Sequence, residues 1–177
     1  MDIVISAKTT DLVIPINLLF WGYLAVYVIH ILEESLLGET FVEKMKTHIW
    51  PDYGWKHFFG FNTMLLSLYV IAVISFESVG GAWIIFPLSL AMERTLNGFW
   101  HLGESIIRRR FSSGLLSSVL VWILTYLIVR YSLIRGEIGA AHFVVSTLTG
   151  AAITGLMMGS MLVFRRKYGK GRMRIAE

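Results

Sequence analysis

The sequence predicts an all-α integral membrane bundle of five transmembrane helices, with an interfacial helix between the first and the second. Hydrophobic residues make up 55% of the 177 positions, and the mean hydropathy is +0.65. Five segments are long and apolar enough to cross a bilayer, which takes about 20 residues. We find no internal repeat, linker or low-complexity tract, so residues 1–177 are expected to form one domain.

The five spans are expected at 12–37, 55–76, 83–107, 115–133 and 141–164, before a basic tail at 165–177. The polar stretch 39–52 between the first two spans predicts the interfacial helix. The end of this stretch and the residues after it carry aromatic side chains of the kind found at the level of the lipid headgroups: Trp50, Tyr53 and Trp55.

The distribution of Lys and Arg predicts the orientation. With five crossings, twelve of the Lys and Arg residues lie on one side of the membrane, and three (Lys8, Arg130 and Arg135) lie on the other. Since positive residues concentrate in cytoplasmic loops, the N-terminus is expected outside and the C-terminus in the cytoplasm. This bias fits the plasma (inner) membrane of a prokaryote. The twelve are Lys44, Lys46, Lys56, Arg108, Arg109, Arg110 and the six in 165–174.

Ionisable residues near the inner end of span one indicate a functional site. His30 and Glu34 are four residues apart and share a helical face, which Glu33 flanks. Such residues are costly within a bilayer, so they mark functional sites more often than structural ones. The pattern His30-Ile31-Leu32-Glu33-Glu34 resembles the signature of the HXXEE family, small membrane proteins without a settled biochemical activity.

Span three carries a matching polar stripe. At about 100° per residue, Glu104, Asn97 and His101 lie at about 20°, 40° and 80° from Glu93 around the helix. His30 and His101 each lie about 18 residues into spans that run in the same direction, so both imidazoles should reach the same depth. The asparagine and the second histidine extend the resemblance to the HXXEE family over spans one to three.

Two imidazoles with several carboxylates suit a divalent cation such as zinc, iron or manganese. A cation held there could activate water for hydrolysis or bind oxygen, and an apolar substrate such as a lipid is expected because the site lies in the bilayer. We expect no other cofactor. The expected metal ligands are His30, Glu34, His101 and Glu104, and the expected catalytic residues are Glu33, Glu93 and Asn97.

Two other functions remain open at this stage. Without a metal, a His/Glu pair could protonate an isoprenoid or sterol double bond, and His30, Glu34, Asn97 and Trp100 resemble the catalytic residues of emopamil-binding-type sterol isomerases. The protein could also be a non-enzymatic metal or proton carrier, or an accessory subunit of a membrane complex.

The composition limits the partners. Cysteine is absent, which excludes disulfides and thiolate metal sites. The basic tail follows an apolar helix, so anionic headgroups are expected to bind it and nucleic acid is not. Ala151, Gly155 and Gly159 form a small-xxx-small face on span five, which predicts packing of another helix, within the chain or across a homodimer.

Overall fold

The computed structural model describes residues 14–168, and these form helices with no β-strand among them. The expected spans are all helical, with ends that differ by a few residues from those expected. The elements are α1 (Ile16–Leu36), α2 (Phe41–His48), α3 (Trp55–Val79), the 3₁₀ turn η1 (Gly81–Ile84), α4 (Ile85–Arg108), α5 (Leu115–Ile134) and α6 (Ala140–Tyr168).

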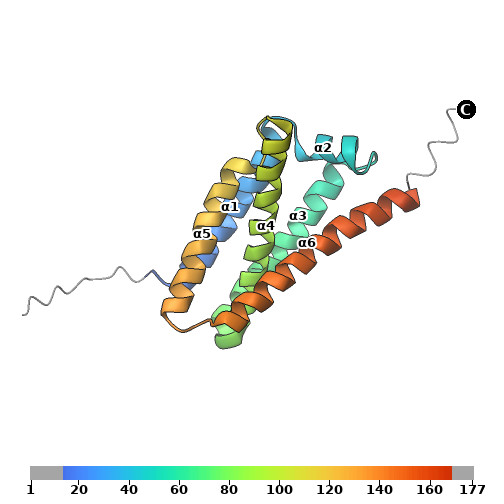
Figure 1. The fold of residues 1–177 in the computed structure, drawn as a ribbon. Helices are drawn as coiled ribbons and strands as arrows, with labels where there is room; N and C mark the ends of the chain where they lie inside the picture. Colours follow the sequence, from blue (N-terminus) through green and yellow to red (C-terminus); the bar gives the residue numbers. More distant parts are fainter. Residues whose placement is uncertain (1–13, 169–177) are drawn as a thin grey trace, which may run out of the picture.

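Helix α4 lies at the centre of the bundle (Figure 1). It packs against α3, α5 and α6, while α1 packs against α5 and α3. The short helix α2 lies across one end, near the start of α3 and the end of α4 (Figure 1). Helices α1 and α5 run side by side, and α6 crosses α4 obliquely and then diverges from it.

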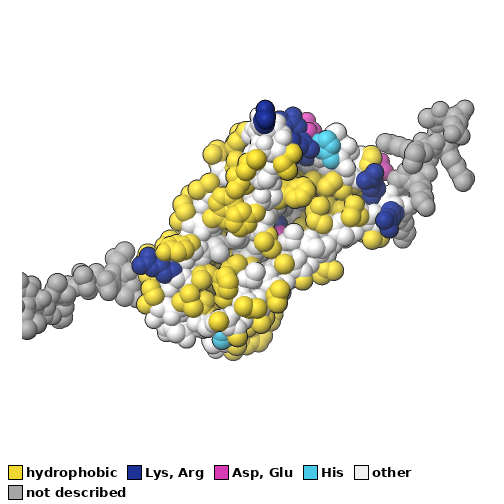
Figure 2. Space-filling view, in the orientation of Figure 1, with side chains coloured by type: hydrophobic (Ala, Val, Ile, Leu, Met, Phe, Trp, Pro, Cys, Tyr) yellow, Lys and Arg dark blue, Asp and Glu magenta, His cyan; other side chains and the backbone are white. Residues whose placement is uncertain are grey.

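Four helices, α1, α3, α5 and α6, are long and apolar enough to cross a membrane. Helix α4 is long enough as well, with 24 residues, but it carries the charged stripe. Its polar side chains point into the bundle: Glu93, Arg94 and His101 are 2%, 6% and 0% exposed. The surface is largely apolar, with charged residues gathered near the ends of the helices (Figure 2).

A helix is present where the interfacial helix is expected, and it is shorter than the polar stretch that predicts it. A capping box fixes its start: Thr40 Oγ1 accepts from the backbone N–H of Glu43, and Glu43 accepts from that of Thr40. These two bonds satisfy amides that a helix start leaves unpaired. They also hold the pKa of the Glu43 carboxyl below its usual range.

The expected aromatic belt is wrong for two of its three residues. Trp50 and Tyr53 are only 5% and 1% exposed, whereas Trp55 is 43% exposed. The reason is that the segment joining α2 to α3 folds inward. Its rings pack on each other and on Phe41, with centroids 5.8 Å apart for Trp50 and Tyr53 and 6.1 Å apart for Phe41 and Tyr53.

Helix α6 contacts α4 through a glycine other than those of the expected small-residue face. A Cβ on Gly150 would lie 2.7 Å from the Ser89 carbonyl oxygen and 2.8 Å from the Glu93 amide nitrogen, so only glycine fits this crossing. Ala151 and Gly155 are exposed, and among residues 14–168 nothing lies within 4 Å of a Cβ placed on Gly155 or Gly159. That face therefore packs no helix of the described chain, and the homodimer stays a prediction.

Candidate metal centre and adjoining cavity

Three buried side chains from α1 and α4 converge inside the bundle. His30, Glu34 and His101 are 1%, 3% and 0% exposed, and their ligand atoms all lie within 4.8 Å of one another. Glu34 Oε1 lies 3.1 Å from His101 Nε2 and 3.6 Å from His30 Nε2. The imidazole centroids are 5.3 Å apart. We call these three residues the His–Glu cluster.

A serine hydroxyl holds the far nitrogen of each imidazole. Ser117 Oγ lies 2.8 Å from His30 Nδ1, and Ser112 Oγ lies 3.0 Å from His101 Nδ1. Ser112 lies in the connection between α4 and α5, Ser117 lies in the first turn of α5, and both are buried. A partner on Nδ1 fixes the ring and leaves Nε2 directed at the centre, which is the arrangement usual for metal-binding histidines.

The side chain of Asn97 bridges the two imidazoles. Its amide nitrogen lies 2.9 Å from His30 Nε2 and 3.3 Å from His101 Nε2. Asn97 also lines the cavity beside the cluster. An amide there can donate a hydrogen bond to a bound molecule, or turn its oxygen to the centre as a further ligand.

Glu33 turns away from the cluster to the start of α5. Its carboxylate accepts three backbone N–H bonds, from Gly114 at 3.0 Å, Leu116 at 3.0 Å and Ser117 at 2.7 Å. These amides have no partner within α5, so an acid from α1 caps that helix. The structure thus places Glu33 as a link between α1 and α5, away from the position expected of a catalytic base.

Gly114 brings the backbone against both imidazoles. Its φ of +99° lies in the left-handed region, and a Cβ would lie 2.7 Å from His101 Nε2 and 3.0 Å from His30 Cε1. Two features therefore require glycine here: the left-handed backbone conformation and the lack of room for a Cβ beside the imidazoles.

Glu104 lies one hydrogen bond removed from the cluster. Its carboxylate accepts from Ser112 Oγ at 2.5 Å and from Lys44 Nζ at 2.9 Å, and Ser112 in turn contacts His101. Lys44 is only 5% exposed and holds α2 against the end of α4. The structure therefore does not bring Glu104 into the group of three.

Glu93 and Arg94 pair with each other. Arg94 Nε and Nη2 each donate to a different Glu93 oxygen at 2.5 Å, and the guanidinium lies 4.8 Å from the centroid of the Tyr27 ring. Two parallel charge-assisted bonds satisfy much of the carboxylate and neutralise both charges. Glu93 therefore faces the cavity as half of an ion pair.

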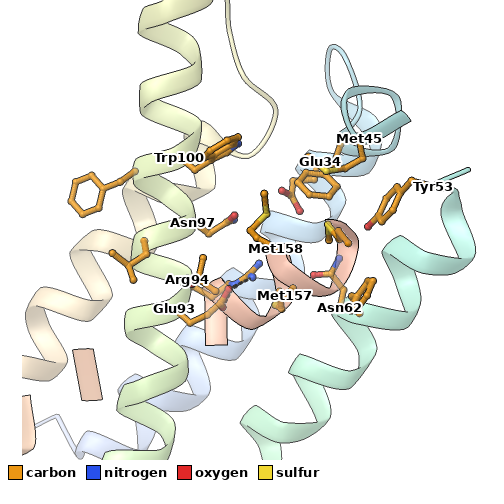
Figure 3. A pocket seen from close by; sticks show the side chains of 16 residues that line it. Glu34, Met45, Tyr53, Asn62, Glu93, Arg94, Asn97, Trp100, Met157 and Met158 are labelled. Atoms are coloured by element: carbon orange, nitrogen blue, oxygen red, sulfur yellow. Dashed lines mark hydrogen bonds and ion pairs between the residues drawn. The ribbon is translucent and has the colours of Figure 1, made fainter. Parts of the chain in front are cut away.

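A cavity of about 360 Å³ adjoins the cluster and lies within the size range of small-molecule sites. Most of its wall is apolar: aromatic rings and methionines from α2, α4 and α6 surround a few polar groups. Asn97 lies on one side with Arg94 and Glu93 below it, Tyr53 and Asn62 lie on the other, and Glu34 lies between the two sides near Met45 (Figure 3).

Tyr53 reaches the cavity from the segment between α2 and α3, and its hydroxyl points inward (Figure 3). Burial raises the pKa of the Tyr53 phenol, and the nearby negative charge of Glu34 raises it further. The phenol therefore stays protonated and can donate a hydrogen bond.

Comparison with known proteins identifies the family. Residues 21–129 match the family described as "Protein of unknown function with HXXEE motif". The chain belongs to the HXXEE family. No curated protein and no solved structure matches it. The matched segment contains α4 and parts of α1 and α5 that carry the His–Glu cluster and its serines.

The structure gives the three named residues of the HXXEE motif two different environments. His30 and Glu34 enter the cluster, whereas Glu33 caps α5. Of the seven expected site residues, the structure brings His30, Glu34, Asn97 and His101 together and leaves Glu33, Glu93 and Glu104 with other partners.

Sequence reasoning missed Ser112, Ser117, Gly114 and Lys44. The signal available was the run Ser112-Ser113-Gly114 immediately before span four, which is polar and lies at the depth expected for His30 and His101. For Tyr53 the sequence indicates a headgroup anchor, and nothing in its local pattern distinguishes that role from a place in a cavity.

Proposed function

We propose that this HXXEE protein is a metal-dependent enzyme of the plasma membrane that acts on a lipid or other apolar substrate. One observation carries the proposal: the buried His–Glu cluster of His30, Glu34 and His101 adjoins an apolar cavity that Glu34 also lines. Metal ligands at the polar end of an apolar cavity suit a reaction at the polar group of an apolar molecule.

The donor separations fit a small divalent cation. Bonds of about 2.0–2.2 Å in tetrahedral geometry place neighbouring donors about 3.4 Å apart. The two separations from Glu34 Oε1 to the imidazole nitrogens, 3.1 and 3.6 Å, bracket this value. Two nitrogens and one carboxylate oxygen are a ligand set that zinc, iron and manganese all accept. The cation would supply Lewis acidity toward the polar group of the substrate.

Among the expected catalytic residues, Asn97 remains as a polar contact for a substrate. It lines the cavity, whereas Glu33 is taken up by three amides of α5 and Glu93 by Arg94. Asn97 can donate to an oxygen that gains negative charge during the reaction.

Metal content tests the proposal directly. Protein purified in detergent should retain close to one divalent cation per chain, and His30→Ala and His101→Ala should each lose it. His142→Ala is the matched control, since His142 lies in the first turn of α6, outside the cluster, and accepts a hydrogen bond from the Gly139 amide. Wild-type protein with no stoichiometric metal after metal-supplemented growth would refute the proposal.

The proposal includes five crossings, with α4 as the third span, the N-terminus outside and the C-terminus in the cytoplasm. The sheltered charges of α4 support this, because ionisable residues in membranes face the bundle interior. The natural chain has no cysteine, so single cysteines can report topology. Lys46→Cys should react with an impermeant maleimide only after permeabilisation, and Ile134→Cys should react in intact cells. Reaction of both on the same side would exclude α4 as a span.

An acid/base isomerase or cyclase without a metal is the second candidate. It is favoured by the partners of the cluster: Asn97 and the serines contact every imidazole nitrogen. The contact of His101 Nε2 with Glu34 can hold a proton for transfer to an alkene. Metal-free protein that binds an isoprenoid alcohol with full affinity would favour this candidate over the first.

A further inference from the structure

The opening of the cavity follows from the way α6 crosses α4. The helices touch at Gly150, where no Cβ fits, and diverge beyond it (Figure 1). The cavity lies in the space beyond the crossing, with Thr154 and Met157 of α6 on one side and Leu96 and Trp100 of α4 on the other. Figure 2 shows the surface hollowed there, with acidic and basic atoms visible at the bottom.

The rim of this opening is suited to hydrocarbon. Phe99 and Trp100 line the cavity and are each 55% exposed on the outer surface of α4. Methionines of α6 form the facing wall, and their flexible thioethers adapt to apolar molecules of varied shape. A ligand can therefore reach the cavity sideways from the bilayer, between α4 and α6, without crossing the headgroup layer.

This route disfavours a permanently charged ligand. Moving an ionised group through hydrocarbon is far more costly than moving a hydroxyl or a carbonyl. The cavity also offers no free cation from its own side chains, because both Glu93 oxygens are bonded to Arg94, the guanidinium that lines the wall. Both features favour one neutral polar group on an apolar body.

Tyr53 presents a polar group to the cavity. Its side chain is 1% exposed and its hydroxyl points into the cavity (Figure 3). No hydrogen bond to that hydroxyl is found within residues 14–168, whereas the neighbouring Asn62 is bonded to Tyr27 and Phe58. Ring contacts with Trp50 and His57, at 5.8 and 5.6 Å, fix its direction. A hydroxyl that faces the cavity can donate a hydrogen bond, so a ligand that supplies an acceptor gains affinity.

We propose that the cavity binds an amphiphile with one neutral oxygen-bearing polar group, an alcohol or a carbonyl, which arrives from the bilayer between α4 and α6 and accepts a hydrogen bond from Tyr53. The polar group then lies between Tyr53 and Asn97, near Glu34. This inference rests on the function proposed above, because both use the same cavity. Tyr53 is then a residue that positions the substrate.

Photolabelling in lipid nanodiscs tests the proposal with three probes of one design. Each carries the same diazirine-bearing dodecyl chain and ends in a hydroxyl, a carboxylate or a trimethylammonium group. The hydroxyl probe should label peptides from α4 and α6 that line the cavity, and unlabelled 1-dodecanol should compete. Tyr53→Phe should weaken its binding about two- to tenfold, the effect of one neutral hydrogen bond.

Tyr126→Phe is the matched control, since Tyr126 is 60% exposed on α5, and it should bind the probe as the wild type does. Tyr53→Phe keeps the ring and its packing, and an unchanged thermal midpoint will show that it is folded. The proposal is overturned if Tyr53→Phe binds the hydroxyl probe like the wild type. It is also overturned if the carboxylate or trimethylammonium probe labels the cavity more strongly.

The proposed metal site and the proposed binding of an amphiphile can be refuted separately. Tyr53→Phe should keep the wild-type metal content while its affinity for the hydroxyl probe falls. Wild-type protein without metal that still shows the Tyr53-dependent labelling would refute the metal-dependent function alone. Metal-loaded protein whose labelling ignores Tyr53 would refute this inference alone.

Discussion

Replacing Gly114 by alanine should damage the His–Glu cluster directly. The new Cβ would lie 2.7 Å from His101 Nε2, 2.8 Å from His101 Cε1 and 3.0 Å from His30 Cε1. Both imidazoles are held from behind by serines, so they cannot retreat without losing a hydrogen bond. Overpacking of this kind costs about 1–3 kcal/mol, and the left-handed backbone adds about 1–2 kcal/mol.

Gly136→Ala separates the two contributions. Gly136 has a φ of +69°, and no atom of the described chain lies within 4 Å of a Cβ placed on it, so alanine there carries the backbone cost without the clash. The difference between the two variants should be about 1–3 kcal/mol, or about 2–12 °C in thermal midpoint for a chain of this size. Intrinsic tryptophan fluorescence during heating in detergent measures it.

The same pair of variants tests the centre itself. Gly114→Ala should lose bound divalent cation, since it displaces two of the three ligands, whereas Gly136→Ala should retain it. Equal midpoints and equal metal contents in the two variants would show that the imidazoles do not lie against Gly114, and the described geometry of the cluster would then be wrong.

Three further predictions concern the groups around the cluster. Ser112→Ala and Ser117→Ala should each weaken metal binding about 10- to 100-fold in competition with a chelator, because each frees one imidazole; unchanged affinity would contradict the supporting role of the hydroxyls. Glu33→Gln should destabilise the protein by about 1.5–3 kcal/mol in thermal unfolding, since a charged cap of three amides is lost, and a shift near zero would contradict the cap. Lys44→Met should lower the free energy of unfolding by about 1.5–3 kcal/mol, because the Glu104 carboxylate loses a donor. The double variant Lys44→Met/Glu104→Gln should recover most of this stability. A thermal midpoint of the double variant equal to that of Lys44→Met would contradict the prediction.

The sequence predicted the helices and the meeting of His30, Glu34 and His101 for one physical reason. A bilayer fixes the length of a span, so position along a span gives depth, and helical periodicity gives the face. These two coordinates were enough to place the imidazoles at one level and on facing sides, as the 5.3 Å between their centroids confirms.

The same reasoning could not separate Glu33 from Glu34. Both are acids at the inner end of α1, yet Glu34 faces the imidazoles while Glu33 meets amides 81 to 84 positions along the chain. That outcome depends on where the α4–α5 connection returns, and no local pattern encodes it. Tyr53 shows the same limit, because burial by a folded-back loop is a tertiary property.

The polar stripe and the cavity arise from one packing problem. A helix with the charges of α4 is stable in an apolar setting only if neighbouring helices shelter its polar face, and α3, α5 and α6 pack around it. Helix α6 comes closest to the α4 backbone at Gly150, where no Cβ fits, and the two helices diverge beyond this crossing and leave space there (Figure 1). That space lies over the part of α4 that carries Asn97 and Trp100. A larger residue at Gly150 should therefore move α6 as a whole, and with it the methionine wall of the cavity.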